Sequence, residues 1–84
     1  AHDLAEAVQR AIDELPERCR LIFLMSRREG LSYSEIAHAL DVAVSTVETQ
    51  ISRALKHLRH RLAPYLVQAL ALSSVLELVR RCLH

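Results

Sequence analysis

The chain has 84 residues, which allows one domain and excludes a large hydrophobic core. Apolar residues make up 51% of it, with one glycine, two prolines and no tryptophan; this favours helices and argues against a hairpin-rich sheet. The net charge of +1 excludes no class of partner by itself. The composition therefore predicts an all-α domain.

The charges are distributed unevenly along the chain. Residues 1–48 contain five Arg and nine Asp or Glu, whereas residues 49–84 contain six Arg or Lys and a single acid, Glu77. Four basic residues fall within nine positions: Arg53, Lys56, Arg59 and Arg61. Such clustering is typical of a nucleic-acid contact and also of a solvated helix face, and charge alone leaves both interpretations open.

No residue set typical of an enzyme or a metal site stands out. Cys19 and Cys82 lie far apart without CxxC spacing, so no disulfide framework or zinc site is indicated and a reducing cytoplasm is expected. His57 and His60 form an i, i+3 pair without a neighbouring carboxylate or cysteine, and Arg59 between them would repel a cation. We therefore predict no enzymatic activity, catalytic residue, metal, cofactor or small-molecule substrate.

Two helices are predicted before Gly30. The first has Asp3 as its N-cap and runs to about Leu15. Its apolar face has helical spacing: Leu4, Ala7, Val8, Ala11, Ile12 and Leu15. Pro16 ends it and suits the first turn of a second helix that runs to about Glu29. This second helix is apolar around much of its circumference, which indicates either burial in the core or a docking surface.

A helix-turn-helix is predicted to follow. Gly30 supplies the left-handed residue that closes the second helix. Ser32 and Glu35 then have the spacing of a capping box, which predicts the start of a third helix. Asp41 occupies the turn, where Asp can adopt the left-handed conformation at some cost.

The fourth helix has two distinct faces. Ser45 and Glu48 have the spacing of a second capping box, so the helix is expected to begin at about Thr46. Its inward stripe is Val47, Ile51, Ala54, Leu55, Leu58 and Leu62. Its outward stripe is Thr46, Thr49, Gln50, Ser52, Arg53, Lys56, His57, Arg59 and His60. Short polar side chains reach base edges and long basic ones contact phosphates, so this order predicts a helix that enters a DNA major groove.

Pro64 is predicted to interrupt the helical pattern. Residues 1–63 are assigned to the DNA-binding domain and residues 64–84 to a C-terminal helical extension of undefined role. The extension places five apolar residues broadly on one side: Leu66, Leu70, Leu76, Val79 and Leu83. It either packs against the chain's own core or binds a partner, and its polar residues argue against a membrane span. The chain opens without a signal peptide, as though cut from within a longer protein.

Four short motifs occur in order along residues 4–63. They are Leu15-Pro16-Glu17-Arg18, Glu29-Gly30-Leu31-Ser32-Tyr33-Ser34-Glu35-Ile36-Ala37, Val44-Ser45-Thr46-Val47-Glu48 and Ser52-Arg53-Ala54-Leu55. Together they resemble the C-terminal DNA-binding domain, region 4, of bacterial RNA polymerase sigma factors of the extracytoplasmic-function (ECF) type. The resemblance implies a four- to five-helix domain with a helix-turn-helix of the winged-helix-like or sigma region 4 type, and it does not cover the C-terminal extension.

The resemblance also implies a function in transcription initiation. Region 4 of this family reads the −35 element of promoter DNA in the major groove and docks on the flap tip of the polymerase β subunit. At the matching positions the implied DNA-binding residues are Ser45, Thr46, Glu48, Thr49, Ser52, Arg53, Lys56 and Arg59. Lys56 and Arg59 would contact phosphates, and Arg27 and Arg28 could contact the DNA backbone as well. An anti-sigma factor is a further candidate partner.

Glu48 and Gln50 stand where many relatives carry Lys or Arg. Glu48 could accept a hydrogen bond from cytosine N4, or it could be committed to its own capping box. Two other functions remain open from the residues alone. One is a stand-alone dimeric helix-turn-helix regulator that dimerises through residues 65–83, and the other is a protein-interaction domain bound by an anti-sigma partner.

Overall fold

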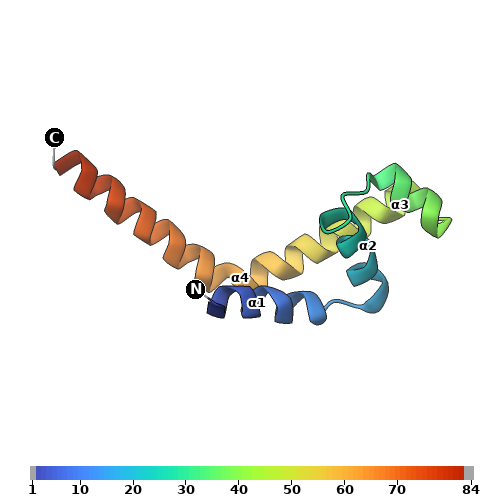
Figure 1. Cartoon of the computed structure of the whole chain (residues 1–84), viewed down its shortest axis with the longest axis horizontal. Helices are drawn as coiled ribbons and strands as arrows, with labels where there is room; N and C mark the ends of the chain where they lie inside the picture. The colour runs from blue at the N-terminus through green and yellow to red at the C-terminus, as the bar shows by residue number, and fades with distance from the viewer. Residues whose placement is uncertain (1, 83–84) are drawn as a thin grey trace.

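The computed structural model describes the backbone of residues 2–82 and the side chains of residues 3–65 and 80–82. It contains the helices α1 (His2–Asp13), α2 (Glu17–Arg27), α3 (Tyr33–Leu40) and α4 (Val44–Cys82). The molecule is elongated, with extents of 57 × 25 × 18 Å, because α4 continues well past the other three helices (Figure 1). The all-α prediction is confirmed. Residues 2–82 contain no strand, so the helix-turn-helix has no wing within the described chain.

The first helix starts and packs slightly differently from the prediction. It begins at His2, so Asp3 lies within its first turn and is not the N-cap. Ala7, Ala11 and Ile12 are buried as expected, but Leu4 is 47% exposed. The apolar face of α1 therefore enters the core only from its second turn onward.

The second helix divides its apolar residues between two sides. Pro16 is its N-cap, one position earlier than the predicted place in the first turn. Cys19, Ile22 and Phe23 are buried, whereas Leu21 is 47% exposed. The wide apolar surface seen in the sequence is thus partly core and partly an exposed flank.

Local signals fix both ends of α3 as predicted. The Ser32 hydroxyl accepts a hydrogen bond from the Glu35 N–H at 3.0 Å, and the Ser32 N–H donates to the Glu35 carboxylate at 2.8 Å. The hydrogen bond from the Ser32 N–H, with a smaller effect of the Ser32 hydroxyl, holds the pKa of the Glu35 carboxyl below its usual value of 4.5. At the other end Asp41 has φ 55° and ψ 49°, and the Val42 N–H reaches the Ala37 carbonyl at 3.0 Å. This is the left-handed closure expected of Asp41, and Gly30 (φ 69°) has the same conformation before α3.

The predicted start of α4 was wrong by two residues. The helix begins at Val44, because the Ala43 carbonyl accepts hydrogen bonds from the N–H groups of Thr46 and Val47 at 3.0 and 3.3 Å. Ser45 consequently lies inside the first turn, and the predicted capping box between Ser45 and Glu48 is not formed.

Pro64 lies inside α4 and does not end it. Figure 1 shows the helix changing direction in this region and leading away from α1–α3. Proline removes one backbone hydrogen bond and bends a helix, and here the helix continues beyond the bend. The predicted C-terminal helix is therefore a continuation of α4. Its predicted apolar face at 66–83 lies outside the described side chains. No helix within the described part of the chain is long and apolar enough to cross a membrane.

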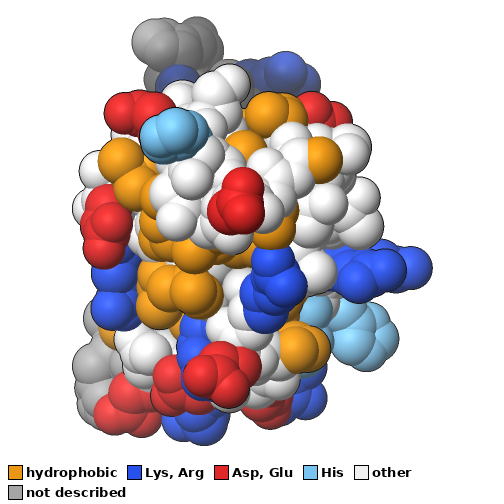
Figure 2. Space-filling model, turned by 90° about the vertical axis from the view of Figure 1, so that its right-hand side faces the viewer, with side chains coloured by type: hydrophobic (Ala, Val, Ile, Leu, Met, Phe, Trp, Pro, Cys, Tyr) orange, Lys and Arg blue, Asp and Glu red, His pale blue; other side chains and the backbone are white. Residues whose placement is uncertain are grey.

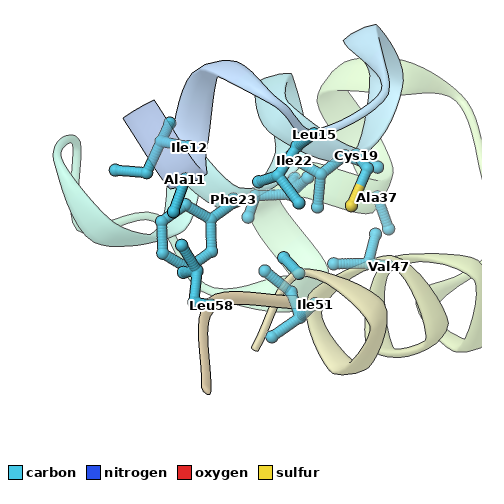
Figure 3. Packing of buried hydrophobic residues seen from close by; sticks show 12 residues of the cluster. Ala11, Ile12, Leu15, Cys19, Ile22, Phe23, Ala37, Val47, Ile51 and Leu58 are labelled. Atoms are coloured by element: carbon cyan, nitrogen blue, oxygen red, sulfur yellow. The ribbon is translucent and has the colours of Figure 1, made fainter. Parts of the chain in front are cut away.

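The core lies where α1, α2 and α3 meet the first half of α4. Figure 3 shows Ile22 and Phe23 of α2 pointing toward Ile51 and Leu58 of α4, with the α1 side chains alongside. Ile22, Ile36, Val47 and Ala54 are completely buried. The inward stripe predicted for α4 is thus confirmed from Val47 to Leu58, and this packing leaves the opposite side of α4 in solvent.

Candidate nucleic-acid interface

The exposed side of α4 carries the residues predicted to bind DNA. A helix turns about 100° per residue, so positions spaced three, four and seven apart share one face. Seven of the eight predicted residues are exposed: Ser45, Glu48, Thr49, Ser52, Arg53, Lys56 and Arg59. Thr46 is half-buried. The structure therefore brings the set together on one continuous surface, with polar residues at the start of α4 and basic ones toward Arg59.

At the polar end of this surface, one side chain is held by a hydrogen bond to the backbone of α4. The Thr49 hydroxyl donates to the Ser45 carbonyl at 2.9 Å, which commits its hydrogen and leaves its oxygen as an acceptor. Glu48, one turn before Ser52, has no hydrogen bond or ion pair with any described side chain. Because its predicted capping box is absent, the Glu48 carboxylate is available to a ligand.

The flank of α4 next to α2 is held by a buried cysteine. The Cys19 thiol donates to the Gln50 carbonyl at 3.3 Å, and Gln50 itself is half-buried. Burial raises the pKa of the Cys19 thiol, and the positive charge of Arg53 opposes this effect. Gln50 therefore lies at the edge of the exposed surface, beside α2.

On the other flank an ionic cluster joins α1 to α4. The Glu14 carboxylate accepts hydrogen bonds from Arg61 at 2.9 and 3.0 Å, and its Oε1 lies 3.1 Å from Nε2 of His57. The sequence does not indicate this contact, since Glu14 and Arg61 are 47 residues apart and no local motif joins them. Arg61 and His57 thus face α1 and hold the base of α4 in place.

Arg27 is the last residue of α2, and Arg28 is its C-cap. The Arg27 guanidinium lies over the Phe23 ring, 5.8 Å from its centroid. Arg28 donates to the Gln9 side chain at 3.1 Å and so links α2 to α1. Both are exposed, and their predicted contact with the DNA backbone stays a prediction.

Charged and apolar surfaces occupy different places on the molecule. Figure 2 looks at the end that holds α3 and shows hydrophobic side chains gathered on one side, bordered by charged groups. The Lys and Arg side chains that project furthest lie on the other side. This separation of charged and apolar side chains suits one polar and one apolar partner surface.

Among the described residues no group of three His, Cys, Asp or Glu side chains is placed to hold a metal ion.

Comparison with known proteins gives a consistent set of relatives. The family described as "Sigma-70, region 4" matches residues 5–58. The ferric citrate uptake sigma factor FecI of Escherichia coli (strain K12) is 44% identical over 46 residues, which are 55% of this chain and 27% of that protein. The ECF RNA polymerase sigma-E factors of Salmonella typhimurium (strain LT2) and Escherichia coli (strain K12) are 36% identical over 64 residues, 76% of this chain. The chain spans 34% of the length of these sigma-E factors.

Proposed function

The chain belongs to the sigma-70 region 4 family, and we propose that it recognises the −35 element of promoter DNA by inserting the start of α4 into the major groove. The observation that carries this proposal is the single exposed face of α4, with Ser45, Thr49 and Ser52 ahead of Arg53 and Lys56. Short polar side chains at the leading end would face base edges. The basic residues that follow would face phosphates. One helix would then supply both the binding affinity and the alignment of the domain on the DNA.

Within this proposal each residue has a distinct role. Arg53 is the main candidate for a bidentate contact to guanine, and Glu48 is the candidate acceptor for cytosine N4. Thr46, Thr49 and Ser52 would make shorter base contacts, while Ser45 would approach the DNA at the leading end. Lys56 and Arg59 would neutralise phosphates and make binding salt-dependent.

We also propose that the exposed flank of α2 docks on the RNA polymerase core, at the flap tip of the β subunit. Leu21 is 47% exposed, and Leu24 and Met25 beside the core are half-buried. An apolar flank separate from the DNA-binding face would allow one small domain to bind DNA and polymerase together. Such a role would place the protein in the cytoplasm, and an anti-sigma factor could compete for either surface.

The test is binding of promoter-length DNA at ~50 mM and ~200 mM salt, with and without polymerase core. Few phosphate contacts predict weak binding by the domain alone, a clear loss of affinity at the higher salt, and tighter binding with core present. Absence of salt-sensitive binding with core present would contradict the DNA proposal and favour a domain that binds only proteins.

A second candidate function has one observation in its favour. Beyond Pro64, α4 leads away from α1–α3 (Figure 1), as would suit a dimerisation helix of a stand-alone regulator. Sedimentation at micromolar concentration separates the two functions. A monomer is expected for the sigma-factor domain, and a tight dimer that binds two DNA half-sites without polymerase would favour the regulator.

A further inference from the structure

One apolar side chain is exposed at the leading end of α4. Val44, the first residue of the helix, is 39% exposed. The other large apolar side chains with high exposure in the described chain are Leu4, Leu21 and Tyr33, none of which lies on α4. By helical spacing Val44 shares a side with the buried Val47 and Ile51 and is one turn from the exposed Glu48. It therefore places an apolar group at the border between the buried side and the exposed face of α4, at the start of the helix.

The neighbours of Val44 indicate which part of DNA it would meet. Glu48 follows one helical turn later and is its neighbour on the helix surface. Because the Glu48 carboxylate is unpaired among the described residues, it would be repelled by phosphates. This flank of α4 is therefore suited to base edges, and the basic residues from Arg53 onward are suited to the backbone.

We propose that Val44 contacts the C5 methyl group of a thymine and so helps to set which promoter sequence is bound. This inference rests on the proposed function, in which α4 enters the major groove with its start leading. Thymine is the one base that presents a methyl group in that groove. Valine suits such a contact because its branched side chain strongly prefers one rotamer in a helix. The contact would remove two apolar surfaces from water.

Replacing thymine by deoxyuridine deletes only this methyl group. A duplex is first selected from a random pool by the native 84-residue chain at low salt, and each of its thymines is then replaced singly by deoxyuridine. One replacement should weaken binding about fourfold, the effect of burying one methyl group. Val44→Ala should weaken binding to the thymine duplex by a similar factor and should be insensitive to that replacement.

The matched control is Leu21→Ala, which truncates an apolar side chain of similar exposure outside the helix-turn-helix. It should retain the response to deoxyuridine, and both variants should keep a cooperative thermal transition with a small drop in melting temperature, because each side chain is about half buried. Equal native affinity for all thymine and deoxyuridine duplexes would overturn the assignment of Val44. So would a Val44→Ala loss that is identical on both duplexes. If the native chain selected no duplex even with polymerase core present, the proposed function would be contradicted, and this inference with it.

Discussion

Arg53 is exposed on α4 and makes no hydrogen bond or ion pair with another described side chain, so its guanidinium is available to DNA. Arg53→Ala should weaken binding to the preferred duplex by about 1–3 kcal/mol, the usual value of a bidentate guanine contact, and should relax specificity at one base pair. Fluorescence anisotropy with matched and mismatched duplexes measures both effects. Thermal melting should be unchanged.

The control for Arg53 is Lys56→Ala on the same face. A phosphate contact carries no sequence information, so this variant should weaken all duplexes alike and reduce the salt dependence. If Arg53→Ala melted the domain and left DNA binding intact in what stayed folded, the two faces of α4 would be assigned the wrong way round.

Val47 lies on the opposite side of α4 and is completely buried. Val47→Asp would place an unpaired charge in the core cluster that contains Ile22, Ile36 and Ala54. The free energy of unfolding of a domain with so small a core is too low to offset this cost. The expected result is loss of the cooperative thermal transition in circular dichroism. Ser52→Asp adds the same charge at an exposed position and should melt normally. A folded Val47→Asp variant would show that this core position tolerates charge.

Residues that obey a local pattern could be assigned from the sequence, whereas those fixed by distant partners could not. The spacing of apolar residues along α4 is sufficient to separate Val47 from Arg53. Nothing local to Glu14 or Arg61 indicates that they meet, and nothing near Leu4 indicates that it stays exposed. Those facts depend on how α1 lies against α4.

At the level of whole elements, α3 is defined by its capping box. The bonds to Ser32 lower the pKa of Glu35, so the ionised carboxylate favours the folded state. Its contribution to stability is present above about pH 4.5, the ordinary pKa, and is lost as the pH falls through the lower folded value. Glu35→Gln should therefore lower the melting temperature at neutral pH and have a shrinking effect below pH 4.5.

Thermal melts of the native chain and Glu35→Gln between neutral and acidic pH measure this difference. Ser32→Ala, which removes the N-cap acceptor, should cost about 1 kcal/mol. If Glu35→Gln lowered the melting temperature by the same amount at all pH values, the charge of the Glu35 carboxylate would not contribute to the stability of the cap.

The junction of α1 and α4 provides a second prediction for elements. Glu14 and Arg61 form a two-point pair, but their side chains are 41% and 52% exposed, so solvent screens it. A double-mutant cycle with Glu14→Ala and Arg61→Ala should give a coupling of about 0.5–1 kcal/mol at low salt that declines at high salt. Zero coupling at low salt would show that this ion pair does not help to position α1 against α4.

The ends of a helix could be predicted from the sequence where a side chain determines them. Ser32 and Asp41 bound α3 through their own hydrogen bonds or backbone conformation, and both were predictable. The start of α4 at Val44 depends on the Ala43 carbonyl, which every residue type offers, so the Ser45–Glu48 spacing was misleading. Pro64 was also misleading, because the helix bends and continues.

On the scale of the whole molecule, the order of four motifs was sufficient to identify the family and its helix-turn-helix. It was not sufficient to place the chain beyond Pro64, which lies outside the matched residues 5–58. The elongated shape arises from this continuation of α4 (Figure 1). The other end of α4 is the part of the helix that is proposed to enter a major groove.

Dimethyl sulfate protection tests this insertion of α4 into the major groove, since the reagent methylates guanine N7 in the major groove and adenine N3 in the minor groove. With the native chain on its selected duplex, and with polymerase core added where the domain alone binds too weakly, we expect guanine N7 within the site to be protected. This protection should weaken in Arg53→Ala. Protection confined to adenine N3, or unprotected guanines in a fully bound complex, would contradict it.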